Sequence, residues 1–409
     1  NTWCYHIEAS VFDKGTAYAV FDGHTMNDMT PYAFKTTDFG KTWTSIISDD
    51  VVGFARNIQE DYENPDLLFL GTEFGLYITM DGGKNWKKFT NNMPAVAVHF
   101  IELHKKTNDL VMGTHGRGII ILDDISPLRS INNEVLGKTL HFFDTPDTEI
   151  SETSSFGGNF GTETQFVGNN KTNDVQIKYY LNKRHTFGKM TMVIEDMEGN
   201  QIAELGPGKS KGINVVNWNY TRKVPKVAKG KTFSFGGFTA PKVPAGTYKA
   251  VITKGKETFE HTFNLVYDKN SPLTEKDREL KEATTMKLYD MTQELAYLVY
   301  ELDEIMENAN TAGDKKTVEK LNSLKETLVI TTGDNYVGTA EPQLRERMAD
   351  LYSKVASNYD KPSAAELKNL EVIAERFNTA KTDFAKLKDK YLKKQAVSLM
   401  TFEDFLESK

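Results

Sequence analysis

The first third of the chain repeats one pattern of hydrophobic and polar positions. The stretch TTDFGKTW at residues 36–43 returns as TMDGGKNW at residues 79–86, which sets a spacing of about forty-three residues. Three copies of the surrounding pattern can be aligned, at residues 6–24, 57–79 and 100–122. Each copy alternates β-branched or aromatic runs with polar turns, and in the first two a fourth strand begins at the tryptophan. Four short antiparallel strands per repeat are typical of a propeller blade, so residues 1–130 are predicted to form blades.

The acidic motif falls between the third and fourth strands of its copy, where its residues suit a turn. The aspartate can accept backbone N–H bonds, the glycine can adopt positive φ, and the tryptophan can pack the outer strand against its neighbour. We therefore assign the motif a structural role and no chemistry. Its residues are Asp38, Gly40 and Trp43 in the first copy, and Asp81, Gly83 and Trp86 in the second.

Three further patterns follow the blades. Residues 131–174, with their Ser-, Thr-, Gly- and Asn-rich stretch, predict a linker. Residues 175–270 carry short strands spaced by turns and predict a small β-sandwich, in which VPAGTYKAVIT resembles the closing hairpin of bacterial Ig-like domains. Residues 271–395 carry apolar stripes at steps of three and four, which predict an antiparallel helical bundle, and residues 396–409 form a tail.

The sequence of the helical region indicates where its helices begin, and its apolar stripes have two possible interpretations. Thr274 is a predicted N-cap, and Ser363 with Glu366 forms a predicted capping box. We expect two long and two shorter helices around an internal core, although such narrow stripes would also suit a coiled-coil contact with a partner. The lysines of KVPKVAKGK (223–231) are interpreted as a solvated loop, with a basic contact patch as the alternative.

Composition narrows the functional classes. The 409 residues carry a net charge of −7 with no dense Lys/Arg stripe, which argues against nucleic acid as a partner. The single cysteine, Cys4, cannot form an internal disulfide. No stretch approaches the ~20 apolar residues of a membrane helix, so no transmembrane segment is predicted in this portion. Because the chain begins at Asn1 without a signal segment, we expect it to be the C-terminal portion of a longer protein.

The motif also carries a family resemblance. TTDFGKTW matches the Ser/Thr-x-Asp-x-Gly-x-Thr-Trp form of the Asp-box, or bacterial neuraminidase repeat, and TMDGGKNW departs from it only at Asn85. The run through GTHGRGIIILDDISPL resembles the closing blades of bacterial sortilin-like propeller proteins, often labelled glycosyl hydrolases, and TTGDNYVGTAEPQLRERM (331–348) resembles their helical tail. The resemblance implies a multidomain, mainly β protein with a C-terminal α-helical bundle, secreted or in the bacterial cell envelope. Three blades cannot close a ring, so we expect further blades upstream.

Candidate functional residues lie on the side opposite the acidic turns. Because strands alternate in direction, the loops between the second and third strands share one rim of the blades. These loops contain Asp22, His24, Asp28, Glu73, His115 and Arg117. Carboxylates beside imidazoles could perform acid/base work or hold a metal, and the arginine could bind a carboxylate or sulfate. The alternative is a structural role, in which His115 and Arg117 hydrogen-bond neighbouring blades while Asp22 and His24 hold their own loop. No nucleophile triad, zinc motif or phosphate loop is present, and we predict no metal and no cofactor.

Three functions are compatible with these features. The first is a binding or assembly module with a protein or glycan partner. The second is an Asp-box glycoside hydrolase whose catalytic carboxylates lie mostly in blades outside this sequence. A sialidase would need an arginine triad, for which only Arg56 and Arg117 are candidates. The third is an accessory subunit of an outer-membrane complex. The sequence leaves open whether the protein is an enzyme.

Overall fold

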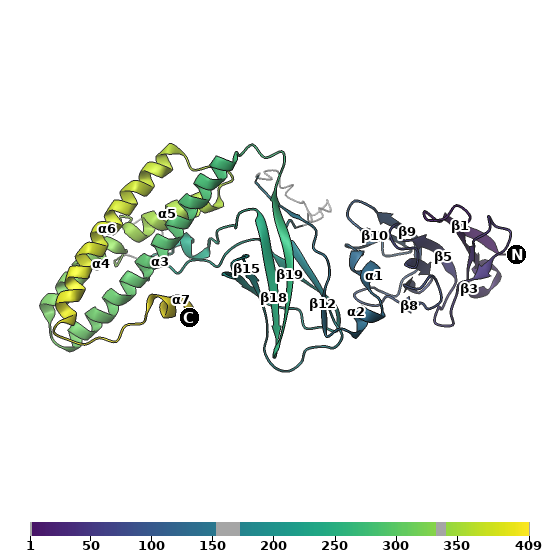
Figure 1. Cartoon of the computed structure of the whole chain (residues 1–409), viewed down its shortest axis with the longest axis horizontal. Helices are drawn as coiled ribbons and strands as arrows, with labels where there is room; N and C mark the ends of the chain where they lie inside the picture. The colour runs from purple at the N-terminus through teal and green to yellow at the C-terminus, as the bar shows by residue number, and fades with distance from the viewer. Residues whose placement is uncertain (1, 153–171, 333–340, 409) are drawn as a thin grey trace. The chain divides into compact units, whose positions relative to one another are not determined.

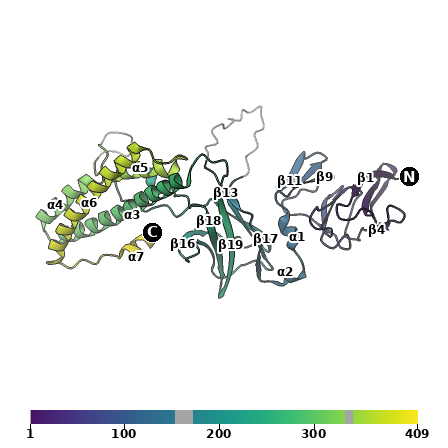
Figure 2. The same ribbon diagram turned by 45° about the horizontal axis from the view of Figure 1, so that its top comes forward.

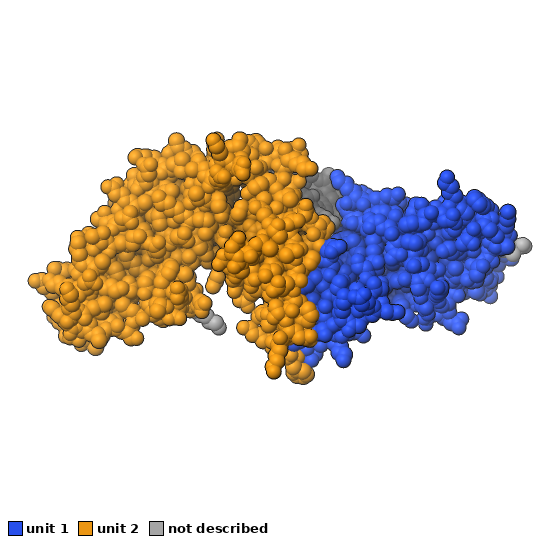
Figure 3. All heavy atoms as spheres, in the orientation of Figure 1, with its two compact units in different colours: residues 1–144, 178–186, 209–215 blue, residues 145–177, 187–208, 216–409 orange. Residues whose placement is uncertain are grey.

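The computed structural model describes residues 2–152, 172–332 and 341–408, which fold as two compact units (Figure 1, Figure 3). One unit comprises residues 1–144, 178–186 and 209–215, and the other residues 145–177, 187–208 and 216–409. Within the described ranges, no helix combines the length and the apolar character needed to cross a membrane.

The aligned copies form three antiparallel sheets. The first is β1 (Trp3–Ala9), β2 (Ala17–Gly23), β3 (Asp28–Thr36) and β4 (Thr44–Ser45), with the 3-10 turn η1 (His24–Met26) between β2 and β3. The second is β5 (Ala55–Glu60), β6 (Leu68–Thr72), β7 (Gly75–Thr79) and β8 (Lys87–Lys88). The third is β9 (Val98–His104), β10 (Asp109–Thr114) and β11 (Ile119–Leu122). The predicted strand order is confirmed, with each fourth strand beginning one residue after its tryptophan.

Apolar clusters join the three sheets face to face. Successive side chains of a strand point to opposite faces, so a strand between two neighbours must be apolar throughout. All five residues of β6 are buried: Leu68 and Leu70 join the cluster shared with the first sheet, and Phe69 joins the cluster shared with the third. The sheets also approach closely at Gly71, where an added Cβ would lie 2.6 Å from the carbonyl oxygen of Val98. The second sheet is therefore the best packed of the three.

Buried ions reinforce these contacts between sheets. Glu60, which is 3% exposed, accepts hydrogen bonds from Ser10 Oγ (3.1 Å) and Val11 N (3.0 Å) in the turn after β1, and from Tyr18 OH (2.8 Å) of β2. Asp61 is fully buried and accepts two bonds from Arg129, at 2.9 Å from both Nε and Nη2.

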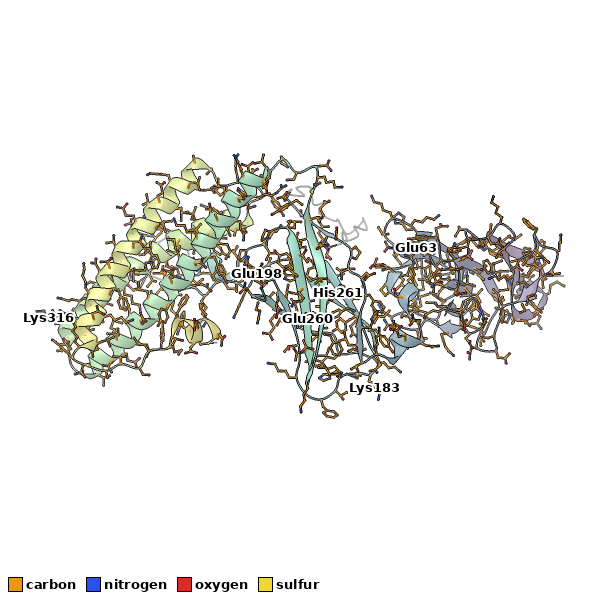
Figure 4. All side chains as sticks on the ribbon, viewed as in Figure 1. Glu63, Lys183, Glu198, Glu260, His261 and Lys316 are labelled. Carbon is orange, nitrogen blue, oxygen red and sulfur yellow. The ribbon has the colours of Figure 1, made fainter. Side chains whose placement is uncertain are left out.

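The side chain of Arg129 also connects the short helix after the third sheet to the turn that follows β5. Its Nη1 lies 3.0 Å from Glu63 Oε1, and Glu63 is labelled in Figure 4. The arginine belongs to α1 (Ser126–Ser130), which precedes α2 (Asn133–Gly137). Because both partners of the Asp61 pair are largely buried, removing one would leave an uncompensated charge.

Two further sheets follow. One has the order β12 (Leu140–Phe142), β14 (Val175–Leu181) and β17 (Gly212–Trp218). The other has the order β13 (Thr148–Ile150), β19 (Glu257–Tyr267), β18 (Gly246–Lys254), β15 (Met190–Glu195) and β16 (Gln201–Leu205), in which β13 runs parallel to β19. The segment predicted as a linker, 131–174, thus contributes α2, β12 and β13, and its residues 153–171 lie outside the described part.

The C-terminal region is a helical bundle, as predicted. Its helices are α3 (Glu275–Thr311), α4 (Lys315–Leu328), α5 (Leu344–Ser357) and α6 (Ala364–Leu392). The long helices α3 and α6 lie side by side in both ribbon views (Figure 1, Figure 2). Thr274 caps α3, and Ser363 with Glu366 makes the predicted capping box of α6. The predicted stripe of α3 lies in the apolar core, at Leu288, Met291, Leu295, Leu298, Leu302 and Ile305.

The lysine-rich loop 223–231 contacts the end of the chain. Lys226 Nζ donates to Ser408 O at 2.6 Å and to Ser408 Oγ at 2.7 Å, and lies over the ring of Phe405. These partners flank or belong to the short helix α7 (Phe402–Glu407) within the predicted tail. One lysine of the loop therefore has an intramolecular role. Of the predicted helical-tail stretch 331–348, residues 333–340 lie outside the described part.

Candidate functional site

The first acidic turn forms a closed network of local hydrogen bonds. Asp38 Oδ1 accepts from Thr36 Oγ1 and from Thr42 N, each at 2.9 Å, and its Oδ2 accepts from Thr42 Oγ1 at 2.7 Å. Thr36 Oγ1 also accepts from Gly40 N at 2.9 Å. Gly40 has φ +80°, the conformation for which glycine is suited. Hydrogen bonds from Thr42 lower the pKa of Asp38, so the carboxylate stays ionised in its turn.

The second acidic turn reproduces this network with one different residue. Asp81 accepts from Thr79 Oγ1 (2.7 Å), from Asn85 N (2.9 Å) and from Asn85 Nδ2 (2.7 Å). Asn85 therefore supplies the same two donors as Thr42 of the first copy. Burial acts to raise the pKa of Asp81, but the hydrogen bonds from Asn85, Thr79 and Lys84 together outweigh it and the pKa is lowered. In both turns the carboxylate oxygens are engaged within the turn.

The opposite rim contains a compact group around Asp22. The Asp22 side chain is 4% exposed; it accepts from His24 N at 2.9 Å and lies 2.8 Å from His24 Nδ1. Arg56 Nε lies 2.9 Å from Asp22 Oδ2, within ion-pair distance although its N–H is not aimed for a hydrogen bond. The imidazole of His24 stacks on Phe54 with ring centroids 4.6 Å apart. The guanidinium of Arg56 covers the ring of Tyr5 at 4.3 Å.

A second group on this rim consists of two stacked imidazoles. The rings of His99 and His115 lie 5.4 Å apart at 24°, and the backbone N of His115 donates to Ala97 O at 2.9 Å. Burial lowers the pKa of His99, and the nearby charge of Arg56 lowers it further. His99 is therefore neutral at pH 7. Asp22 and His24 also influence His99 electrostatically, as expected for residues on one rim.

The remaining predicted residues take separate positions. Glu73 is half-buried, and its Oε2 has no hydrogen-bond partner among the described residues. Arg117 is exposed in a turn between Gly116 (φ +90°) and Gly118 (φ +64°). Asp28 accepts locally from Thr30 N and Tyr32 OH. The structure thus brings together Asp22 with His24, holds His115 on His99, and commits Asp28 to its own strand.

Tyr5 and His99 were missed by the sequence interpretation, and Arg56 was weighed only as a sialidase arginine. All three stand two positions before an isoleucine within the first strand of each copy, namely Ile7, Ile58 and Ile101. The starts of β1, β5 and β9 pair with the ends of β2, β6 and β10, where the rim loops begin. Aligning the first strands of the three copies would have found this row.

The described residues contain no group of three or more His, Cys, Asp or Glu side chains arranged to hold a metal ion. The rim therefore contains the carboxylate of Asp22, paired with Arg56, and two stacked imidazoles. Of its two arginines, Arg56 is largely buried and Arg117 is exposed. Such an arrangement can donate hydrogen bonds to an acidic group and can stack on a flat ring. It does not present a pair of free carboxylates.

Comparison with known proteins gives limited likenesses. No protein-family model matches the chain, and no curated protein matches it. Among solved structures, a GH74 enzyme of Niastella koreensis is 13% identical with a TM-score of 0.27, covering 64% of this chain and 38% of its own. A GH74 xyloglucanase of Xanthomonas campestris is 12% identical with a TM-score of 0.26, covering 64% and 38%.

A third solved structure is PorZ of Porphyromonas gingivalis, a surface component of the type-IX secretion system. It is 11% identical with a TM-score of 0.24, covering 64% of this chain and 39% of its own. The chain thus spans less than two fifths of the length of these three structures. At these TM-scores the likenesses carry no argument about function.

Proposed function

We propose that this chain is a binding or assembly module of a secreted or cell-envelope protein, contacting a protein or glycan partner at the rim. In this proposal the rim site consists of Asp22, His24, Glu73, His115 and Arg117 together with Arg56 and His99. The three sheets serve as Asp-box propeller blades of the sortilin-like kind, and residues 175–270 serve as an Ig-like spacer before the bundle.

One observation carries the proposal, namely the state of Asp22. Its carboxylate is buried and held by His24 and Arg56, so it orients the rim and is not available as an acid or base. An oriented imidazole and a guanidinium over aromatic rings present donors without mobile side chains. Preorganised donors favour binding because little side-chain entropy is lost when a ligand arrives.

The carboxylates of the rim also bear on the choice between a glycoside hydrolase and a binding module. A glycoside hydrolase needs two carboxylates flanking the scissile bond. Of the rim carboxylates, Asp22 and Asp28 are engaged by neighbours, which leaves Glu73 alone. This favours the binding module. A hydrolase with carboxylates in further blades, or an accessory subunit of an outer-membrane complex, are the competing outcomes of the test below.

The test is an array of acidic and neutral glycans and peptides probed with the chain. We expect binding of acidic members, and the double change His115→Ala with Arg117→Ala should weaken it about tenfold or more, as expected for lost hydrogen bonds to a charged group. The matched control is His104→Ala, because His104 is an exposed histidine at the other end of β9, beyond the rim.

Two results would overturn the assignment. The first is binding that the rim changes leave intact while His104→Ala weakens it. The second is hydrolysis of a glycan that depends on Glu73, which would place the chain with the hydrolases. Circular dichroism of each variant checks that the sheets remain folded.

A further inference from the structure

The second unit contains a cleft that is separate from the rim. It has a volume of about 410 Å³ and lies where strands β13 and β19 and the loop after η2 (Phe235–Phe238) meet the first turns of α3 and the end of α5. This volume falls within the ~300–1,000 Å³ of ordinary small-molecule sites. Its lining combines apolar side chains with several cations, which is unusual for an interior face between two layers.

Two lysines enter this cleft without an acidic partner. Lys242 Nζ donates to the carbonyl oxygen of Ser151 at 3.1 Å, and Lys281 Nζ donates to that of Asn358 at 2.5 Å. Neither lysine forms an ion pair within the described part of the chain. Burial lowers the pKa of both, and the charge of Lys242 lowers the pKa of Lys281 further. Both lysines line the same cleft.

The acidic side chains of the cleft are committed elsewhere. Glu152 accepts two bonds from Arg278, at 2.7 Å from Nε and 2.6 Å from Nη2, and Arg278 in turn covers the ring of Tyr267 at 4.0 Å. Burial raises the pKa of Glu282, whose carboxylate lies 3.7 Å from Arg222. The Arg278 charge is thereby paired directly. Glu152 attracts both lysines and Asp360 attracts Lys281 electrostatically, but no carboxylate forms an ion pair with either amine within the described residues.

The number of unused N–H donors on the two lysines favours an anionic ligand in the cleft. An ammonium group has three N–H donors, and each lysine uses one on a neutral carbonyl oxygen. The ammonium of Lys242 also lies over the rings of Tyr220 and Tyr359, at 5.3 Å and 5.1 Å from their centroids. Neither lysine makes a second hydrogen bond within the described residues, so each retains N–H donors that a ligand could use. A buried charge is stable when it is paired, so a resident anion would relieve the repulsion between the amines.

We propose that this cleft binds a small organic acid, with one carboxylate of the ligand held between Lys242 and Lys281. The hydroxyl and amide groups of Thr285, Ser357 and Asn219 line the same cleft and would receive the polar groups of the ligand. The site is independent of the rim, because it stands on different residues of the other unit.

Calorimetric titration of the chain with sodium glucuronate, sodium succinate and inorganic phosphate at constant ionic strength tests the proposal, with glucose as the neutral control. We expect saturable binding of at least one carboxylate and none of glucose. Lys242→Met and Lys281→Met should each weaken it about tenfold or more, since each removes charge-assisted hydrogen bonds while keeping an apolar stem. Lys276→Met is the matched control, because Lys276 is an exposed lysine of the same helix, outside the cleft lining.

A second measurement needs no variant and so does not depend on folding of the mutants. Acylation of the wild-type protein near pH 9, followed by mass spectrometry, should show slower modification of Lys242 and Lys281 when glucuronate or succinate is present. Modification of Lys276 should not change. Absence of any saturable binding, equal protection of all lysines, or binding of phosphate but of neither carboxylate would overturn the proposal.

Discussion

The two acidic turns, residues 36–43 and 79–86, share their hydrogen bonds and differ in their surroundings. In both, the aspartate accepts from the threonine two positions earlier and from the residue four positions later. Trp43, however, is 42% exposed and donates at 3.2 Å to Gly40 O of its own turn. Trp86 is fully buried and donates at 2.6 Å to Ile46 O of the preceding sheet.

The comparison shows that the hydrogen bonds of the turn depend on the motif alone, whereas burial of the tryptophan depends on the preceding sheet. The turn closes through its own side chains, so it forms alike whether or not another sheet covers it. The tryptophan contributes packing only where a preceding sheet is present. Gly83 marks the same contact, because a Cβ added there would lie 2.9 Å from Ile46 Cβ. The motif thus forms a turn on its own, and its second copy also packs against the preceding sheet through Trp86 and Gly83.

The largest expected effect comes from the tryptophans. Trp86→Ala should destabilise the first three sheets by about 3–5 kcal/mol, because it empties a fully buried site and leaves Ile46 O without its donor. Trp43→Ala should cost about 1 kcal/mol or less, since the ring already faces solvent in part. Hydrogen exchange of the β6 amides is the suitable measurement, because it reports on this unit alone in a chain of several parts.

Equal losses in the two variants would break the comparison, since they would mean that Trp43 is buried in solution by something beyond the described residues. Leu76→Ala is a useful reference for the size of the effect. Leu76 is also fully buried in the second sheet, but it faces the third sheet and touches neither acidic turn.

Much of this fold follows from patterns visible in the sequence. The strand order of the first three sheets, the cap at Thr274 and the box at Ser363 depend on residues close together in the chain, and these predictions are confirmed. The contact of Lys226 with Ser408 could not be foreseen, because the two residues are distant in sequence and no local pattern links them. Local signals predict elements, whereas contacts between elements depend on packing.

The rim shows the same limit. Asp22 ends β2 and His24 begins η1, so their contact depends on residues two positions apart in the chain. The prediction did not foresee that Arg56 approaches Asp22, since that contact depends on the close packing of two sheets. The stacking of His99 on His115 likewise pairs the start of one strand with a loop beyond the next. An alignment of the three copies could have predicted that Arg56 and His99 lie near the rim. It would have had to include the first strand of each copy, whose start lies beside the rim loops.

A smaller effect is expected from the turn carboxylates, and it depends on pH. Asp38 and Asp81 both have lowered pKa values in the folded protein, so their contribution is present above the unfolded value of about 3.9 and is lost as the pH falls through the folded value. Asp38→Asn and Asp81→Asn should therefore lower stability at pH 6, and the loss should shrink as the pH falls below about 4. Amide exchange of wild type and variants across this range is the measurement. A difference that persisted undiminished at low pH would show that the carboxylate charge is not the cause.

The smallest effect is expected from exchanging the one residue that differs between the two networks. Thr42 and Asn85 each donate a backbone N–H and a side-chain group to their aspartate, with side-chain bonds of 2.7 Å in both turns. Both residues are exposed, so Thr42→Asn and Asn85→Thr should each change stability by no more than about 0.5 kcal/mol. Thr42→Val and Asn85→Val are the matched controls, since valine cannot donate from its side chain. If the exchanges cost as much as the valine variants, the two turns would not be interchangeable, and each would depend on its surroundings as the tryptophans do.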